Sequence, residues 1–424
     1  MNTRTLRLTL GLLILALAGA ALGIWWTARE GSPPPATSNE PFSPTPQQIE
    51  RGAYLARAGN CAACHTTRGG APYAGGVGIT TPFGTVFSSN LTPDSTTGLG
   101  QWSAADFWRA MHHGRSRSGE LLYPAFPYTS YTLVSRDDSD ALFAYLRSLA
   151  SVSSPNQPHT LEFPYSSQAA LAVWRALFFR PAEFEPEASR SAEWNRGAYL
   201  VRGLGHCAEC HAQRNALGAA QAPQELRGGL MPLQHWYAPS LASTGEAGVG
   251  QDDVDATIAL LKTGVAQGRS AMGPMAEVVY RSTQYLRDSD LRAIVVYLKD
   301  LPSVQPQTHQ GTAADQTAQF ADGKKIYALH CAECHGEQGE GAQGAYAPLA
   351  ANRAVGLTTP TNLVQAVLNG GFAPATAANP RPYGMPPFRQ ILDDREVAAV
   401  LTYIRQAWGN AAPPVSPLDV MQYQ

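Results

Sequence analysis

Charged residues are scarce in this chain of 424 residues: Asp, Glu, Lys and Arg make up 15% of it, against about 25% in typical soluble proteins. The net charge is only −2. Because no basic field results, nucleic-acid binding is not expected. Gly (39) and Pro (32) are plentiful, which indicates many loops and short helices. A chain of this length and composition is expected to form several small, mainly α domains rather than one core.

The chain also lacks the motifs of several enzyme classes. It has no GxGxxG dinucleotide fingerprint between a strand and a helix, no GxSxG nucleophile turn and no HExxH zinc motif. Nicotinamide-dependent and hydrolytic chemistry are therefore not indicated. No catalytic residue is predicted in this chain.

Cysteine is scarce too, and none is left over for a disulfide. The six cysteines form three pairs, each followed at once by a histidine: Cys61, Cys64 and His65; Cys207, Cys210 and His211; Cys331, Cys334 and His335. Two cysteines one helical turn apart can form thioethers with a porphyrin while the histidine binds its iron. A zinc ribbon needs no histidine after each pair, and a thioredoxin-like redox pair would not occur three times. The spacing therefore predicts three covalently bound haem c groups.

The second axial ligand of such an iron is usually methionine or histidine. Met385 lies in a Gly-Met-Pro-Pro turn before the last predicted helix, and it is the predicted iron ligand after the third motif. Alignment on the following helix selects Met275 after the second motif, with Met272 in reserve.

The first motif departs from this pattern, because Phe126 stands where the other two segments have methionine. The candidate ligands there lie on the preceding predicted helix: Met111, His112 and His113. A five-coordinate iron is the alternative.

Similar segments surround the three motifs. Arg51-GAYLARAGN precedes the first, Arg196-GAYLVRGLGH the second, and Gly323-KKIYALH, more loosely, the third. Amphipathic helices with acidic starts are predicted from residues 137, 288 and 393. These repeats predict three tandem cytochrome c-like domains after one N-terminal membrane-spanning helix. The expected boundaries are 1–28 (anchor or signal), 29–46 (spacer), 47–150 (domain 1), 151–189 (linker), 190–302 (domain 2), 303–317 (linker), 318–409 (domain 3) and 410–424 (tail).

The N-terminal run from Leu8 to Trp26 carries no charge and follows Arg4 and Arg7. About 19 apolar residues can span a bilayer, and the arginines favour a cytoplasmic N-terminus. We therefore expect a retained anchor with the rest of the chain in the periplasm. A cleaved signal peptide is the alternative. The aromatic stretch from Leu171 to Pro181 is expected to be buried between the first two domains, or to contact a partner or membrane surface.

The segments GAYLARAGNCAACHT, TPFGTVFSSNLTPD, LLYPAFPYTSYT, RGAYLVRGLGHCAECH and GPMAEVVYRSTQYL resemble one family. This is the three-haem cytochrome c subunit of membrane-bound bacterial dehydrogenases for alcohols, aldehydes, polyols and sugar acids. The resemblance implies an electron-transfer subunit at the inner membrane. Its partner would be a catalytic dehydrogenase subunit of the quinoprotein, flavoprotein or molybdopterin type, and its acceptor ubiquinone or a terminal oxidase.

Two rival functions remain at this point. An open iron at the first motif would suit a peroxidase-like haem enzyme. The cytochrome subunit of a terminal oxidase would usually carry more membrane helices than the one predicted here.

Overall fold

The computed structural model describes residues 42–231, 233–250, 253–304 and 316–423, and it is mainly helical as predicted. The predicted membrane run from Leu8 to Trp26 lies outside these residues. Among the helices that are described, none is long and apolar enough to cross a bilayer. The chain divides into two compact units: residues up to Leu55 with Cys64–Glu185, and Ala56–Ala63 with Pro186–Gln424.

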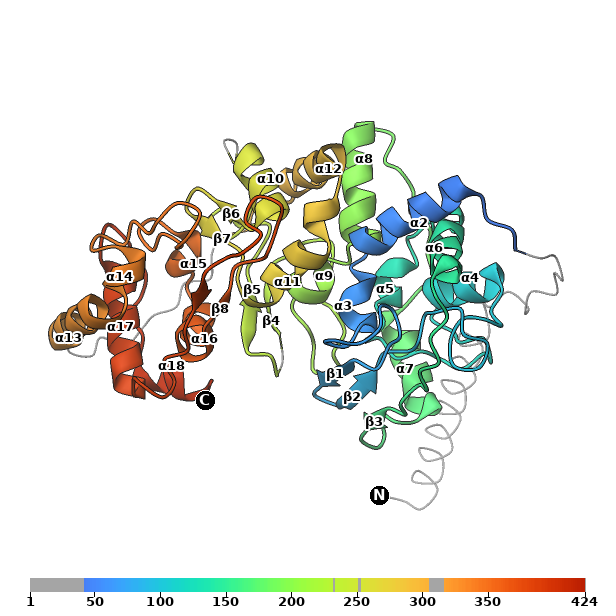
Figure 1. Cartoon of the computed structure of the whole chain (residues 1–424), viewed down its shortest axis with the longest axis horizontal. Helices are drawn as coiled ribbons and strands as arrows, with labels where there is room; N and C mark the ends of the chain where they lie inside the picture. Colours follow the sequence, from blue (N-terminus) through green and yellow to red (C-terminus); the bar gives the residue numbers. More distant parts are fainter. Residues whose placement is uncertain (1–41, 232, 251–252, 305–315, 424) are drawn as a thin grey trace, which may run out of the picture. The chain divides into compact units, whose positions relative to one another are not determined.

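Up to Glu185 the chain forms six helices and one antiparallel sheet of order β1-β2-β3 within the described residues (Figure 1). The helices are α2 (Pro46–Ala58), α3 (Cys61–His65), α4 (Ala104–His113), α5 (Tyr128–Tyr131), α6 (Arg136–Ser148) and α7 (Gln168–Phe178). The strands are β1 (Gly78–Thr81), β2 (Gly84–Phe87) and β3 (Thr160–Leu161).

After Pro186 the strands form only two-stranded antiparallel ribbons in the described residues. The helices are α8 (Ala192–Tyr199), η1 (Leu200–Leu204), α9 (Ala208–His211), α10 (Val254–Thr263), α11 (Gly273–Arg281), η2 (Thr283–Tyr285), α12 (Asp288–Lys299), α13 (Gln316–His330), α14 (Ala332–His335), α15 (Arg353–Gly356), α16 (Thr361–Asn369), α17 (Asp394–Gln406) and α18 (Pro417–Met421). The paired strands are β4 (Gly229–Met231) with β5 (Trp236–Ala238), β6 (Val265–Ala266) with β7 (Arg269–Ser270), and β8 (Gly371–Phe372) with β9 (Gly384–Met385).

One helix crossing occurs three times, and a glycine makes each crossing possible. In each case a helix that precedes a cysteine pair lies against the carbonyl of an alanine and the side chain of a tyrosine on a later helix. The three sets are Gly52 with Ala141 and Tyr145, Gly197 with Ala293 and Tyr297, and Gly323 with Ala399 and Tyr403. A Cβ at any of these glycines would overlap the carbonyl oxygen. The close approach explains why the sequence repeats glycine at this position.

Ion pairs hold two of these crossings. Arg51 Nε donates to Asp138 Oδ1 at 2.6 Å, and Arg196 Nε donates to Asp290 Oδ1 at 2.8 Å. Each arginine directly precedes the crossing glycine, and both aspartates are buried near the start of the later helix. The pairs therefore fix the helix before a motif relative to the helix after it.

A turn of π-helix distinguishes the second repeat from the first. From the shared Arg-Gly-Ala-Tyr-Leu sequence to the cysteine, the second repeat is one residue longer than the first. The extra residue is accommodated in η1, where the helix widens before Cys207. Insertion of one residue into a helix commonly produces such a π turn. The glycine crossing is thereby kept while the cysteine pair stays at the end of the helix.

The C-terminal residues pack onto α17 through a buried arginine. Arg405 is fully buried, and its guanidinium donates to the carbonyls of Pro413 (2.8 Å), Val355 (3.1 Å) and Thr358 (3.2 Å). Burial lowers the pKa of Arg405 to about 10, so the side chain stays charged at neutral pH. Residues 410–424, predicted as a tail, thus include a segment fixed to the last long helix.

Replacement of Arg405 by methionine is expected to destabilise this part of the chain by about 3 kcal/mol, because one buried and two half-buried carbonyls lose their donor. Arg395→Met on the exposed side of the same helix is the matched control. The measurement is the urea midpoint of each purified variant. Equal midpoints for the two variants would show that Arg405 does not hold the segment.

Candidate haem sites

Each cysteine pair and its histidine lie on one short helical turn: α3, α9 or α14, the last two starting just after the first cysteine. No disulfide links the six cysteines, all of which lie in the described residues. Burial, followed by the neighbouring cysteine, raises the pKa of Cys207 to about 12 and that of Cys331 to about 11. This apolar setting opposes the thiolate form that zinc needs. It is compatible with sulfurs bonded to an apolar macrocycle.

The three motif histidines each make the same kind of hydrogen bond. Nδ1 of each ring lies within 3 Å of a backbone carbonyl oxygen: His65 with Ser89 (2.7 Å), His211 with Pro239 (2.7 Å) and His335 with Ala347 (2.9 Å). A carbonyl only accepts, so each Nδ1 donates and the lone pair lies on Nε2. Burial lowers the pKa of all three rings, which favours their neutral form. A neutral imidazole oriented in this way is the form that binds iron.

The backbone carbonyl of each of these histidines is also held in the same way. It accepts from the amide of a glycine with positive φ: Gly75 at 2.9 Å, Gly228 at 2.8 Å and Gly341 at 2.8 Å. The left-handed conformation of these glycines turns the chain back towards the motif. A residue with a Cβ would adopt this conformation less readily. The three motifs thus have the same local geometry although their loops differ in sequence.

The third segment places its predicted ligand on the same core as its motif. Met385 lies on β9, half-buried, and packs against the hydrophobic cluster that includes Tyr327 and Phe388. Cys331, the first cysteine of the motif, packs against that same cluster. The structure therefore brings these two predicted site residues to one core.

In the second segment, the two candidate methionines lie at the start of α11. Met272 is the residue before the helix and Met275 lies in its first turn, both half-buried. Between them, Gly273 lies against the ring of Trp236 on β5, so closely that a Cβ there would meet the indole. Strand β5 leads directly to Pro239, the acceptor for the motif histidine. One strand thus contacts both the methionine-bearing turn and the histidine support.

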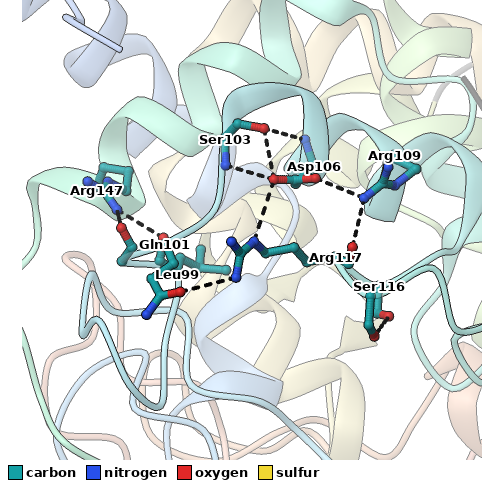
Figure 2. A network of polar contacts seen from close by, with 10 residues as sticks. Leu99, Gln101, Ser103, Asp106, Arg109, Ser116, Arg117 and Arg147 are labelled. Carbon is teal, nitrogen blue, oxygen red and sulfur yellow. Dashed lines mark hydrogen bonds and ion pairs between the residues drawn. The ribbon is translucent and has the colours of Figure 1, made fainter. Parts of the chain in front are cut away.

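The first segment positions its candidate ligands on α4. Ser103 and Asp106 form a capping box at the start of that helix, with amide-to-oxygen distances of 3.0 and 3.1 Å (Figure 2). Arg109 Nη2 donates to Asp106 Oδ1 (2.8 Å) and to the carbonyl of Arg117 (3.1 Å), as Figure 2 shows. This network ties α4 to the loop that follows it. Met111, His112 and His113 form the last turn of the helix.

Hydrogen bonding supports the predicted correspondence between Phe126 and Met275. Two glycines that end helices accept matching bonds: Gly114 from the amide of Leu122 (2.9 Å) and Gly264 from the amide of Ala271 (2.7 Å). Phe126 and Met275 each lie four residues further on. Phe126 instead packs its ring edge-on against Tyr131. The first segment therefore has an aromatic contact where the second has a methionine.

The three candidates in the first segment differ in their surroundings. The His112 ring stacks on Trp108 with centroids 4.4 Å apart and hydrogen-bonds the backbone of Thr132. Nδ1 of His112 and Nδ1 of His113 are both buried and have no hydrogen-bond partner among the described residues. Burial, then the nearby His112 and arginine charges, lowers the pKa of His113 to about 4. Met111 is buried. Of the three, His112 thus has both a stacked aromatic ring and a backbone hydrogen bond. The residue that binds the iron at this site stays a prediction.

Comparisons with known proteins place the chain in a family. A sequence model of cytochrome c matches residues 49–150 and 320–408. The chain is 38% identical to the cytochrome c subunit of a quinone alcohol dehydrogenase from Gluconacetobacter polyoxogenes, covering 88% of this chain and 83% of the relative. It is 39% identical to a gluconate 2-dehydrogenase cytochrome c subunit from Pantoea cypripedii (86% of each) and 33% identical to a fructose dehydrogenase cytochrome subunit from Gluconobacter japonicus (96% and 87%). The chain belongs to the family of dehydrogenase cytochrome c subunits.

Membership in this cytochrome c family implies covalently bound haem c and electron transfer. The two regions that match cytochrome c contain the first and third motifs, while the second lies between them. Sequence reasoning missed the carbonyl acceptors Ser89, Pro239 and Ala347, because a backbone acceptor leaves no residue signature. The Gly-Gly pairs at 75–76 and 228–229 were the available signal for the loops that return to the motif.

Proposed function

We propose that this cytochrome c subunit carries three haem c groups and relays electrons from a catalytic dehydrogenase subunit. The observation that carries the proposal is the threefold repetition of one geometry: cysteine pair, Nδ1-donating histidine, and glycine-held histidine carbonyl. Three such sites in one chain suit a protein that passes electrons from haem to haem.

The residues divide the work at each site. The pairs Cys61 and Cys64, Cys207 and Cys210, and Cys331 and Cys334 would hold the macrocycles covalently. The axial histidines would be His65, His211 and His335, and Met275 and Met385 would complete two of the three irons. When bound, haem supplies reversible one-electron transfer at its iron. The protein fixes the orientation of each axial imidazole through its Nδ1 hydrogen bond.

The names of the relatives and the N-terminal sequence support the proposed partners and location. The names of the relatives specify alcohol, gluconate and fructose dehydrogenases, so we propose a donor with a CH–OH or aldehyde group, oxidised by a separate quinoprotein, flavoprotein or molybdopterin subunit. Electrons would leave to ubiquinone or a terminal oxidase. The apolar run from Leu8 to Trp26 would anchor the chain in the bacterial inner membrane, with the haem domains in the periplasm.

Isolation of the tagged full chain from detergent-solubilised membranes tests the relay. We expect a dehydrogenase to co-purify, and one of its alcohol, sugar or sugar-acid donors to reduce the haems, which a short-chain ubiquinone then reoxidises. Haems that no donor reduces, together with turnover of peroxide and a strong high-spin ferric signal, would favour the peroxidase-like alternative instead. The missing methionine at Phe126 is the observation behind that alternative.

Replacement of Met385 by alanine is expected to lower the reduction potential of one haem by at least about 0.1 V. A methionine thioether ligand raises the potential of a haem, and the choice of axial ligands sets haem potentials over a range of about 0.8 V. Met421→Ala is the control, since that methionine is exposed on α18. A spectroelectrochemical titration resolves the components. Unchanged potentials in the Met385 variant would remove this methionine from the ligand set.

A further inference from the structure

We propose that Asn362, in the segment of the third motif, is a positioning residue for the axial histidine His211 of the second motif. The inference rests on the proposed haem sites at these motifs. Asn362 lies at the start of α16, in the segment of the third motif, whereas His211 belongs to the second motif.

Asn362 pairs with both backbone groups of one residue. Its Oδ1 accepts from the amide of Tyr237 at 2.8 Å, and its Nδ2 donates to the carbonyl of Tyr237 at 2.8 Å. A side-chain amide used in this way replaces a neighbouring strand on the open edge of β5. Because the two bonds hold the peptide groups on either side of the Tyr237 Cα, they restrict both sliding and tilting of the strand.

Strand β5 and its partner β4 hold His211 from two sides. Pro239, directly after β5, accepts from His211 Nδ1 at 2.7 Å. Gly228, directly before β4, donates to the His211 carbonyl at 2.8 Å. The edge of β5 that Asn362 occupies lies only two residues from the Pro239 carbonyl. A shift of this strand would therefore lengthen or tilt the bond that orients the imidazole.

The far end of α16 reaches the predicted third site. Gly370 ends the helix, and a Cβ at this glycine would meet the carbonyl of Met385. The interior of α16 is rigidly packed, with Val364 and Leu368 almost fully buried. The helix thus connects the histidine support of the second site to the methionine strand of the third.

A second polar contact joins the same two segments without touching β5. Asp253, next to α10, pairs with Arg353 at 2.6 Å and with Arg269 at 2.6 Å. Loss of Arg353 leaves Asp253 paired with Arg269. Arg353→Gln therefore weakens the same interface while leaving the His211 support in place, and it is the matched control.

The test uses the full chain with Asn362→Leu, Arg353→Gln and the double variant Cys207→Ser/Cys210→Ser. The double variant identifies the haem 2 signal as the component it loses. In Asn362→Leu we expect three haems, altered ferric g values for haem 2 alone and a raised haem 2 potential, because a weaker Nδ1 bond makes the imidazole a poorer electron donor. Arg353→Gln is expected to leave the haem 2 signal unchanged.

Three outcomes are decisive. Identical haem 2 signals in wild type and Asn362→Leu would overturn the positioning role, as would an equal shift in Arg353→Gln. Should Asn362→Leu fail to fold, Asn362→Asp, which keeps the acceptor for the Tyr237 amide but loses the donor, is expected to give a smaller shift of the same sign. No haem loss in the cysteine double variant would instead contradict the proposed function itself, independently of Asn362.

Discussion

Serine in place of Cys331 and Cys334 is expected to reduce the covalent haem content from three to two per chain and to abolish most donor-to-quinone electron transfer. His335 cannot hold the group covalently, because only the two sulfurs form covalent bonds to the macrocycle. The measurements are haem absorbance per chain and quinone reduction by the co-purified complex. Glu333→Gln, an exposed substitution inside the same motif, is the control and should keep both values.

The double serine variant also tests the assignment of the third motif. A chain that kept all three haems would contradict it, since every cysteine is already assigned to a pair. Loss of haem with full retention of quinone reduction would place the third site outside the electron path.

Valine in place of Gly197 is expected to cost at least about 3 kcal/mol of folding free energy, because its Cβ would overlap the carbonyl of Ala293 where α8 crosses α12. We also expect loss of haem at the Cys207 pair, which follows directly from this helix. The urea midpoint and the haem content report the two effects.

Gly356→Ala is the control for this crossing. Nothing lies within 4 Å of a Cβ at Gly356, so the substitution should leave stability within about 1 kcal/mol. Equal midpoints for the two glycine variants would show that the crossing tolerates a side chain. The same comparison applies at Gly52 and Gly323, whose surroundings match those of Gly197.

The features that the sequence predicted are those encoded locally. The CxxCH spacing specifies its chemistry within five residues, and helical periodicity with acidic starts indicated the helices that became α6, α12 and α17. Mainly helical structure and the dehydrogenase cytochrome family are confirmed. The three-domain boundaries and the ligand assignments stay predictions.

The features that the sequence did not reveal depend on long-range contacts. Gly197 was visible in the repeat, but its role depends on Ala293, almost a hundred residues later. Asn362 has no motif, and its partner is the backbone of Tyr237. The sequence pattern indicated that Arg405 is part of the basic end of an amphipathic helix. In the structure its side chain is instead buried and donates to three backbone carbonyls. Such roles follow from packing and not from local pattern.

The most direct test of three haem sites in one relay is the intact mass of the purified, matured chain under denaturing conditions, with haem absorbance counted beside it. The account predicts the polypeptide mass plus three covalently retained haems. A matured chain that carries two haems or fewer, or releases its haem on denaturation, would contradict it.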